Sequence, residues 1–118
     1  MQKNSEIVIF ETEDNQVKLP VTIEGETVWL NRNQMSELFD RDVKTIGKHI
    51  NNALKEELSV DNSTVAKFAT VQIEGEREVE RYIEYYSLDV IISVGYRVKS
   101  KRGVEFRRWA NSLLRWGI

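Results

Sequence analysis

Residues 35–50, MSELFDRDVKTIGKHI, contain two short helical patterns separated by a tight polar turn. The first pattern places Met35, Leu38 and Phe39 on one face. The second places Val43, Ile46 and Ile50 on one apolar face. Two amphipathic helices joined by so short a turn have the spacing of a helix-turn-helix. This spacing constrains the fold more than any other feature of the chain, although an ordinary pair of helices packed on a sheet has the same pattern.

The side chains of the second helix that do not belong to its apolar face are polar. They are Lys44, Thr45, Lys48, His49 and Asn52. Lysines suit phosphates, whereas hydroxyl, imidazole and amide groups suit the edges of bases. The pattern therefore predicts that a helix over about 42–54 enters the major groove of double-stranded DNA.

Before this helical pair, the chain alternates in the manner of strands. Residues 7–10 are a short apolar run, and residues 17–24 alternate apolar and polar side chains with a period of two. A turn signal at Gly25 leads into residues 27–30, which completes an N-terminal hairpin. Pro20 cannot donate to a ladder, so we expect its strand at an edge of the sheet or this position facing outward.

After the helical pair, two strand-like stretches at residues 65–73 and 78–86 surround Gly75. Glycine gives a tight turn the positive φ that it needs, so these stretches predict a second hairpin. A hairpin at this place in the chain has the position of the wing in a winged helix. Its tip carries three glutamates against Arg77 alone, so we do not assign the tip to DNA.

The last third of the chain predicts two helices. Ser87 is an expected N-cap with Asp89 in the first turn, and Gly103 precedes a final helix whose apolar residues recur with the helical period. The predicted fold is α+β: a winged-helix-like helix-turn-helix core with two β-hairpins and a C-terminal helical pair. With 118 residues, the whole chain (1–118) is expected to form a single domain.

Charge is segregated along the chain although the net charge is only −2. Residues 1–40 hold 3 basic and 8 acidic side chains, whereas residues 81–118 hold 8 basic and 3 acidic ones. The densest basic run is RVKSKRGVEFRR at residues 97–108. We expect it to bind phosphates through Lys99, Lys101, Arg102 and Arg108, with Arg97 beside them. The alternative is a solvated basic junction that pairs with the acidic N-terminal third.

Other function classes find little support in the sequence. The chain has no cysteine and one histidine, so neither a thiolate metal site nor a histidine pair can form. No nucleotide-binding or nucleophile motif occurs, and no catalytic residue, cofactor or small-molecule substrate is expected. The longest apolar run is four residues, too short to span a membrane. We expect a non-enzymatic cytoplasmic protein.

Two stretches carry a family resemblance: ETVWLNRNQMSELFDRDVKTIGKHINN at residues 26–52 and YYSLDVIISVGYRVKSKRGVEFRRWAN at residues 85–111. With them the chain resembles the RhuM virulence-protein family, whose members are described as bacterial DNA-binding proteins. A looser similarity extends to the Bro-N and KilA-N type domains of phage antirepressors. The resemblance implies a DNA-binding domain without enzymatic activity. Because family members continue beyond the match to Trp109, it also implies the N-terminal part of a longer protein.

The sequence therefore supports two hypotheses. The first is a double-stranded DNA-binding domain, alone or as a homodimer, that acts in transcriptional or phage-related regulation. The second is a protein-interaction or oligomerisation module, in which the basic junction meets an acidic partner or the acidic N-terminal part of a neighbouring copy.

Overall fold

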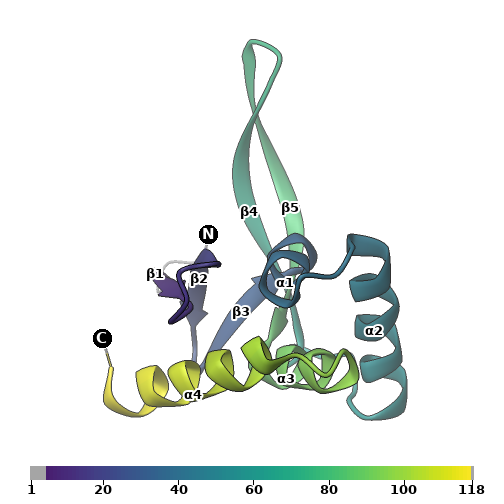
Figure 1. Ribbon diagram of the computed structural model, residues 1–118. Coiled ribbons are helices and arrows are strands. Elements are labelled where there is room, and N and C mark those ends of the chain that lie inside the picture. The colour runs from purple at the N-terminus through teal and green to yellow at the C-terminus, as the bar shows by residue number, and fades with distance from the viewer. Residues whose placement is uncertain (1–4, 118) are drawn as a thin grey trace.

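The computed structural model describes residues 5–117 as one sheet with four helices packed against it (Figure 1). The strands are β1 (Glu6–Glu11), β2 (Lys18–Glu24), β3 (Thr27–Asn31), β4 (Val65–Glu74) and β5 (Arg77–Ser87). The helices are α1 (Arg32–Phe39), α2 (Val43–Glu56), α3 (Leu88–Arg97) and α4 (Lys101–Trp116). The predicted α+β class and the C-terminal helical pair are confirmed.

All five strands join one antiparallel sheet in the order β1-β2-β3-β5-β4. The N-terminal strands form a meander of three, and β5 pairs with β3 only at the three residues that lead into α3. Of the two alternatives predicted for Pro20, the edge strand is wrong, because β2 lies between β1 and β3, and the outward-facing position is confirmed. The ladder between β2 and β3 begins only at Thr22, so Pro20 has no partner residue in β3 and its missing N–H breaks no bond of that ladder. The side chain of Pro20 is exposed.

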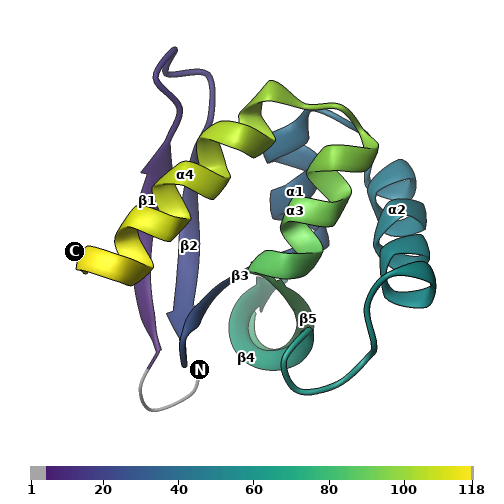
Figure 2. The same ribbon diagram turned by 90° about the horizontal axis from the view of Figure 1, so that it is seen from below.

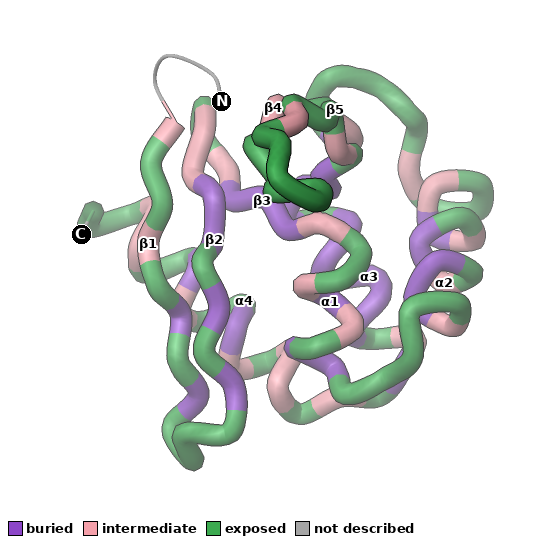
Figure 3. The backbone as a smooth tube through the Cα atoms, turned by 90° about the horizontal axis from the view of Figure 1, so that it is seen from above, coloured by how far each residue is buried: buried purple, intermediate pink, exposed green. Residues whose placement is uncertain are grey.

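The main core lies between the sheet and the helices. Seen from below, α4 crosses β1 and β2, while α3 lies between α4 and α2 (Figure 2). Phe10 of β1 packs edge-on against Phe106 and Trp109 of α4, with ring centroids 5.1 Å apart in both pairs. The buried residues follow the inner sides of these elements (Figure 3). This aromatic burial helps to hold α4 on the sheet.

The β4–β5 hairpin leaves the body of the molecule and projects into solvent (Figure 1). A small second core anchors its base, where Phe68 contacts Trp29 and Tyr85 edge-on at 5.9 and 5.1 Å. Beyond that core almost every side chain is exposed. We call residues 67–84 the arm. Gly75 turns the chain at its end with φ of 66°, as the sequence predicts.

Helices α3 and α4 approach each other closely at two glycines. A Cβ at Gly95 would lie 3.5 Å from the Cα of Gly103 and 3.2 Å from the ring of Phe39, the last residue of α1. Because neither glycine has a side chain, the Phe39 ring can touch both helices at once. The final helix begins at Lys101 rather than after Gly103, so this glycine acts as a packing residue within α4.

The start of α3 differs in detail from the prediction. Ser87 is the N-cap, but its hydroxyl is buried and makes no hydrogen bond. The hydroxyl of Thr27 instead accepts a hydrogen bond from the Leu88 backbone N–H at 3.4 Å.

None of the helices in residues 5–117 is long and apolar enough to cross a bilayer.

The contact at Gly95 generates a stability prediction. Alanine would gain about 1 kcal/mol of helix propensity at either glycine. At Gly95 the new methyl meets the buried Phe39 ring at 3.2 Å, whereas at Gly103 its nearest neighbours lie at 3.4 Å. Overpacking costs about 1–3 kcal/mol, so Gly95→Ala should be less stable than Gly103→Ala by roughly that amount in urea unfolding. Adding Phe39→Leu to Gly95→Ala should recover part of the loss, and equal stability of the two glycine variants would contradict the packing argument.

Candidate nucleic-acid interface

Local sequence fixes where α1 and α2 begin. The side chain of Asn31 accepts a hydrogen bond from the Gln34 backbone N–H at 2.8 Å, and the side-chain oxygen of Gln34 accepts one from the Asn31 backbone N–H at 2.9 Å. This reciprocal capping box starts α1. Asp42 caps α2 by accepting from the Thr45 backbone N–H at 3.3 Å. Both helices therefore start at residues that the sequence favours for capping.

The turn between the two helices is held by its own polar groups. Asp40 ends α1 with φ of 53°, and the hydroxyl of Ser36 donates to the carbonyl of Arg41. The Arg41 guanidinium donates to the carbonyl of Phe39 at 3.1 Å and to that of Val98 at 3.0 Å. The second bond ties the turn to the end of α3 and sets the direction in which α2 leaves.

One face of α2 is open to solvent. Ile46, Gly47, Ile50 and Ala53 are buried against the body. The predicted inward position of Val43 is wrong, because this first residue of α2 lies next to the turn and is 39% exposed. The exposed face consists of Lys44, Lys48, Asn51 and Lys55, which recur at i, i+4, i+7 and i+11. In the part of the chain that the structure describes, no ion pair occupies these lysines. Asn51 and Lys55 were missed by the sequence analysis, although their spacing from Lys44 and Lys48 is the signal that could have found them.

Three predicted base contacts lie on the flank of α2 rather than on its exposed face. Thr45, His49 and Asn52 each follow an exposed residue by one position, and each is half-buried. The hydrogen bond of the Thr45 side chain, and to a smaller extent the charge of Lys44, lowers the pKa of the Asp42 carboxyl. The Thr45 side chain therefore lies beside the Asp42 cap at the start of α2.

Arg32, at the first position of α1, is a further cation beside α2. Its guanidinium lies 3.2–3.3 Å from the place that a Cβ of Gly47 would occupy, so the missing side chain of Gly47 allows Arg32 to rest on α2. Arg32 also reaches the hydroxyl of Tyr86, whose pKa is raised mainly by burial. The sequence analysis did not select Arg32, because a single arginine at the start of a helix belongs to no pattern that indicates a binding residue.

The cations of the predicted basic junction, residues 97–108, are of two kinds: some bond to other parts of the fold, and others are exposed. Arg97 pairs with Glu57 at 2.6 Å and with Glu56 at 3.3 Å, which joins α3 to the end of α2. Arg102 is half-buried and donates to the carbonyl of Leu38 at 3.4 Å. Arg108 is exposed beside the acidic loop after β1, in a depression that Glu13 also lines.

Lys99 and Lys101 are exposed at the junction and share a surface depression with Arg107 of α4, a residue that the sequence analysis did not select. The floor of this depression is apolar, with Ile92 and Val104 among its lining residues. Its volume is about 490 Å³. We call it the hollow. Lys101 also lines the depression that contains Arg108. The structure thus places Lys101 next to both Lys99 and Arg108, whereas Arg102 is engaged with the Leu38 carbonyl.

Comparison with known proteins bears on the second half of the chain. The model of the virulence protein RhuM family matches residues 63–116, which include β4, β5, α3 and α4. The RhuM resemblance is confirmed over these residues. The RhuM match is a little under half of the chain and does not include α1 or α2. No curated protein and no solved structure gives a significant match.

Among residues 5–117, no three potential metal-ligating side chains of the His, Cys, Asp and Glu types lie together.

The cap of α2 predicts how the stability of the protein depends on pH. Because the folded pKa of Asp42 is lowered, its carboxylate contributes stability above its ordinary pKa, and this contribution is lost as the pH falls through the folded value. Thr45→Val removes the hydroxyl and should raise the pKa of Asp42, measured by NMR titration. Lys44→Ala should raise it less.

Urea unfolding provides the matching stability measurement. Thr45→Val should be less stable than the parent protein at about pH 6, and the difference should shrink as the pH falls and the carboxyl becomes protonated in both folded proteins. A stability difference that does not change with pH would show that the hydroxyl acts through something other than Asp42.

Proposed function

We propose that this chain is a non-enzymatic double-stranded DNA-binding domain that presents the exposed face of α2 to the major groove. The observation that carries the proposal is the row of Lys44, Lys48, Asn51 and Lys55 on one open helix face. Three lysines free of ion pairs with described residues supply charge for phosphates, and the amide of Asn51 can bond base edges.

The surroundings of α2 support this proposal. The helix has 14 residues and is held by a short turn, so its open face can approach a duplex without moving the rest of the fold. We interpret α1 and α2 as a helix-turn-helix and the β4–β5 hairpin as occupying the position of a wing. The hairpin differs from a phosphate-binding wing, because residues 65–87 carry five glutamates against three cations.

The proposal depends less on the junction than the sequence suggested. Arg102 and Arg97 are engaged with other parts of the fold, and Arg108 lies beside an acidic loop. We therefore assign the main DNA contact to α2, with Thr45, His49 and Asn52 at its margin. We propose that the protein acts in the cytoplasm in transcriptional or phage-related regulation. A single short module binds DNA weakly, so specific binding would require a second copy or an additional segment.

Salt dependence of binding tests the lysine face directly. Lys44→Ala plus Lys48→Ala should weaken binding to a short mixed-sequence duplex, measured by fluorescence anisotropy. The slope of log K against log[salt] should become shallower by roughly 2, about 0.9 for each lost phosphate contact. The matched control is Lys18→Ala plus Arg115→Ala, which removes two exposed cations from β2 and the far end of α4. Equal weakening by control and test variants, or no binding by the parent protein, would refute the proposal.

Two neighbouring asparagines test which side of α2 meets the DNA. Asn51 is exposed and Asn52 is half-buried, and the sequence analysis selected Asn52. Asn51→Ala should reduce affinity for a duplex selected from a random-sequence pool by about 1–3 kcal/mol if its amide contacts a base, whereas Asn52→Ala should have a smaller effect. The reverse order would show that the DNA approaches the flank of the helix.

A further inference from the structure

The arm carries an exposed face of unusual chemistry. In the β4–β5 register, Ala69 pairs with Tyr82, Val71 with Glu80, and Ile73 with Glu78, and paired residues share a face of the ribbon. Val71, Ile73 and Tyr82 are 66%, 70% and 68% exposed. This face therefore combines apolar side chains with glutamates, and none of its glutamates forms an ion pair with a described residue.

The opposite face of the arm is internally paired. Arg81 makes a bidentate bond with Glu74, at 2.9 Å from its Nε and 2.7 Å from its Nη2. Below this pair, Phe68 is buried in the second core. The ribbon is thus fixed from one side, while Val71, Ile73 and Tyr82 on the other side are exposed.

The hollow between α3 and α4 has the complementary chemistry. Its lining includes apolar Ile92, Tyr96 and Val104, and its cations are Lys99, Lys101 and Arg107. No carboxylate lines it, and Tyr96 is 84% exposed. A depression of about 490 Å³ is large enough for a few side chains. An apolar floor with a basic rim suits an acidic, apolar protein segment better than it suits bare phosphates.

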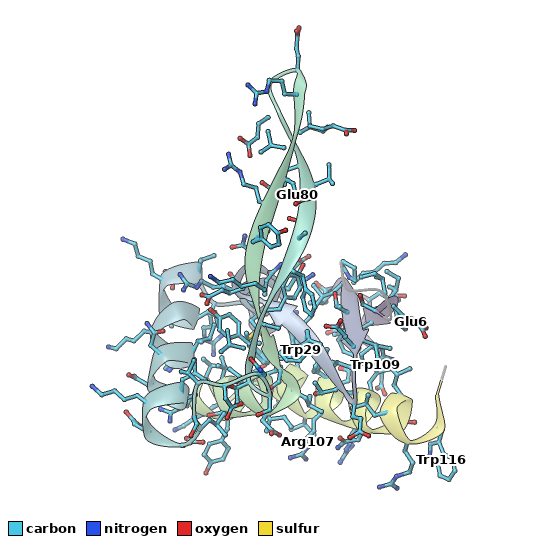
Figure 4. All side chains as sticks on the ribbon, turned by 180° about the vertical axis from the view of Figure 1, so that it is seen from behind. Glu6, Trp29, Glu80, Arg107, Trp109 and Trp116 are labelled. Carbon is cyan, nitrogen blue, oxygen red and sulfur yellow. The ribbon has the colours of Figure 1, made fainter. Side chains whose placement is uncertain are left out.

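The arm cannot reach the hollow of its own chain. From Lys67 to Glu74 the ribbon extends by seven residues, about 23 Å, away from the body. The arm and the α3–α4 pair lie at opposite ends of the molecule (Figure 1), and Figure 4 shows Glu80 on the arm and Arg107 on the underside of α4. Contact between the two surfaces therefore requires two molecules.

We propose that the arm of one copy docks in the hollow of another copy, with its glutamates against Lys99, Lys101 and Arg107. Direct packing of two arm faces would oppose glutamates with glutamates, which is unfavourable. Docking of an arm in a hollow is heterologous, and because the two surfaces lie at opposite ends, it produces growing chains rather than a closed pair. The proposal does not rest on DNA binding.

Sedimentation velocity without DNA tests this proposal with two variants. The arm variant is Val71→Ser plus Ile73→Ser, and the hollow variant is Lys101→Glu plus Arg107→Glu. The parent protein should increase in mass beyond a dimer as its concentration rises from micromolar toward millimolar, and less so at high salt. Each variant alone should stay monomeric. An equimolar mixture should form a 1:1 complex, because it contains one intact hollow and one intact arm.

Matched controls separate docking from general surface effects. Ile7→Ser plus Ile9→Ser removes two exposed apolar side chains from β1, and Lys18→Glu plus Arg115→Glu reverses two exposed cations outside the hollow. Both controls should associate like the parent protein. A parent protein that stays monomeric, or controls that lose association as the variants do, would overturn the proposal. Self-association of the hollow variant would also overturn it and would indicate pairing between arms.

Discussion

The contact of Phe39 with Gly95 and Gly103 determines how the four helices are arranged. The ring at the end of α1 touches α3 and α4 where these two helices come closest. A side chain at Gly95 would push the ring away and would separate α1 from the C-terminal pair. Because the turn to α2 begins one residue after Phe39, this contact also fixes the point from which α2 leaves the core. The open face of α2 is therefore a consequence of packing at two glycines some fifty residues further along the chain.

The same region shows why a run of basic residues does not by itself define a binding surface. Carbonyl groups at the ends of helices lack partners within the helix, and arginine side chains can reach them. Arg41 and Arg102 bond carbonyls near the ends of α1 and α3 in this way. Their charge stabilises the junction, whereas Lys99 and Lys101 stay exposed beside apolar side chains. A single basic segment thus provides both structural bonds and a free cationic rim.

Local signals in the sequence predict the helices and strands well. Most features that the sequence analysis missed depend on contacts between residues far apart in the chain. Caps at Asn31 and Asp42 and the turn at Gly75 lie where their residue types favour them. The pairing of β3 with β5 could not be foreseen, because it joins strands separated by two helices. From the sequence, either Asn51 or Asn52 of α2 could have faced solvent. Asn51 is the exposed one because α2 packs on α3 and because Gly47 is buried beneath Arg32. The roles of Arg97 and Arg102 likewise depend on partners far away in the sequence.

Electrostatics assigns the two proposed activities to different surfaces. A duplex approaching the end of the arm would meet more carboxylates than cations, because residues 74–80 hold four glutamates and one arginine, so phosphates are repelled there. At the exposed face of α2 the charge is positive, and no described carboxylate forms an ion pair with its lysines. The arm can therefore contact protein without competing with DNA for the same residues. A chain of copies joined from arm to hollow would carry one α2 face per copy, and binding through several such faces would be stronger than binding through one.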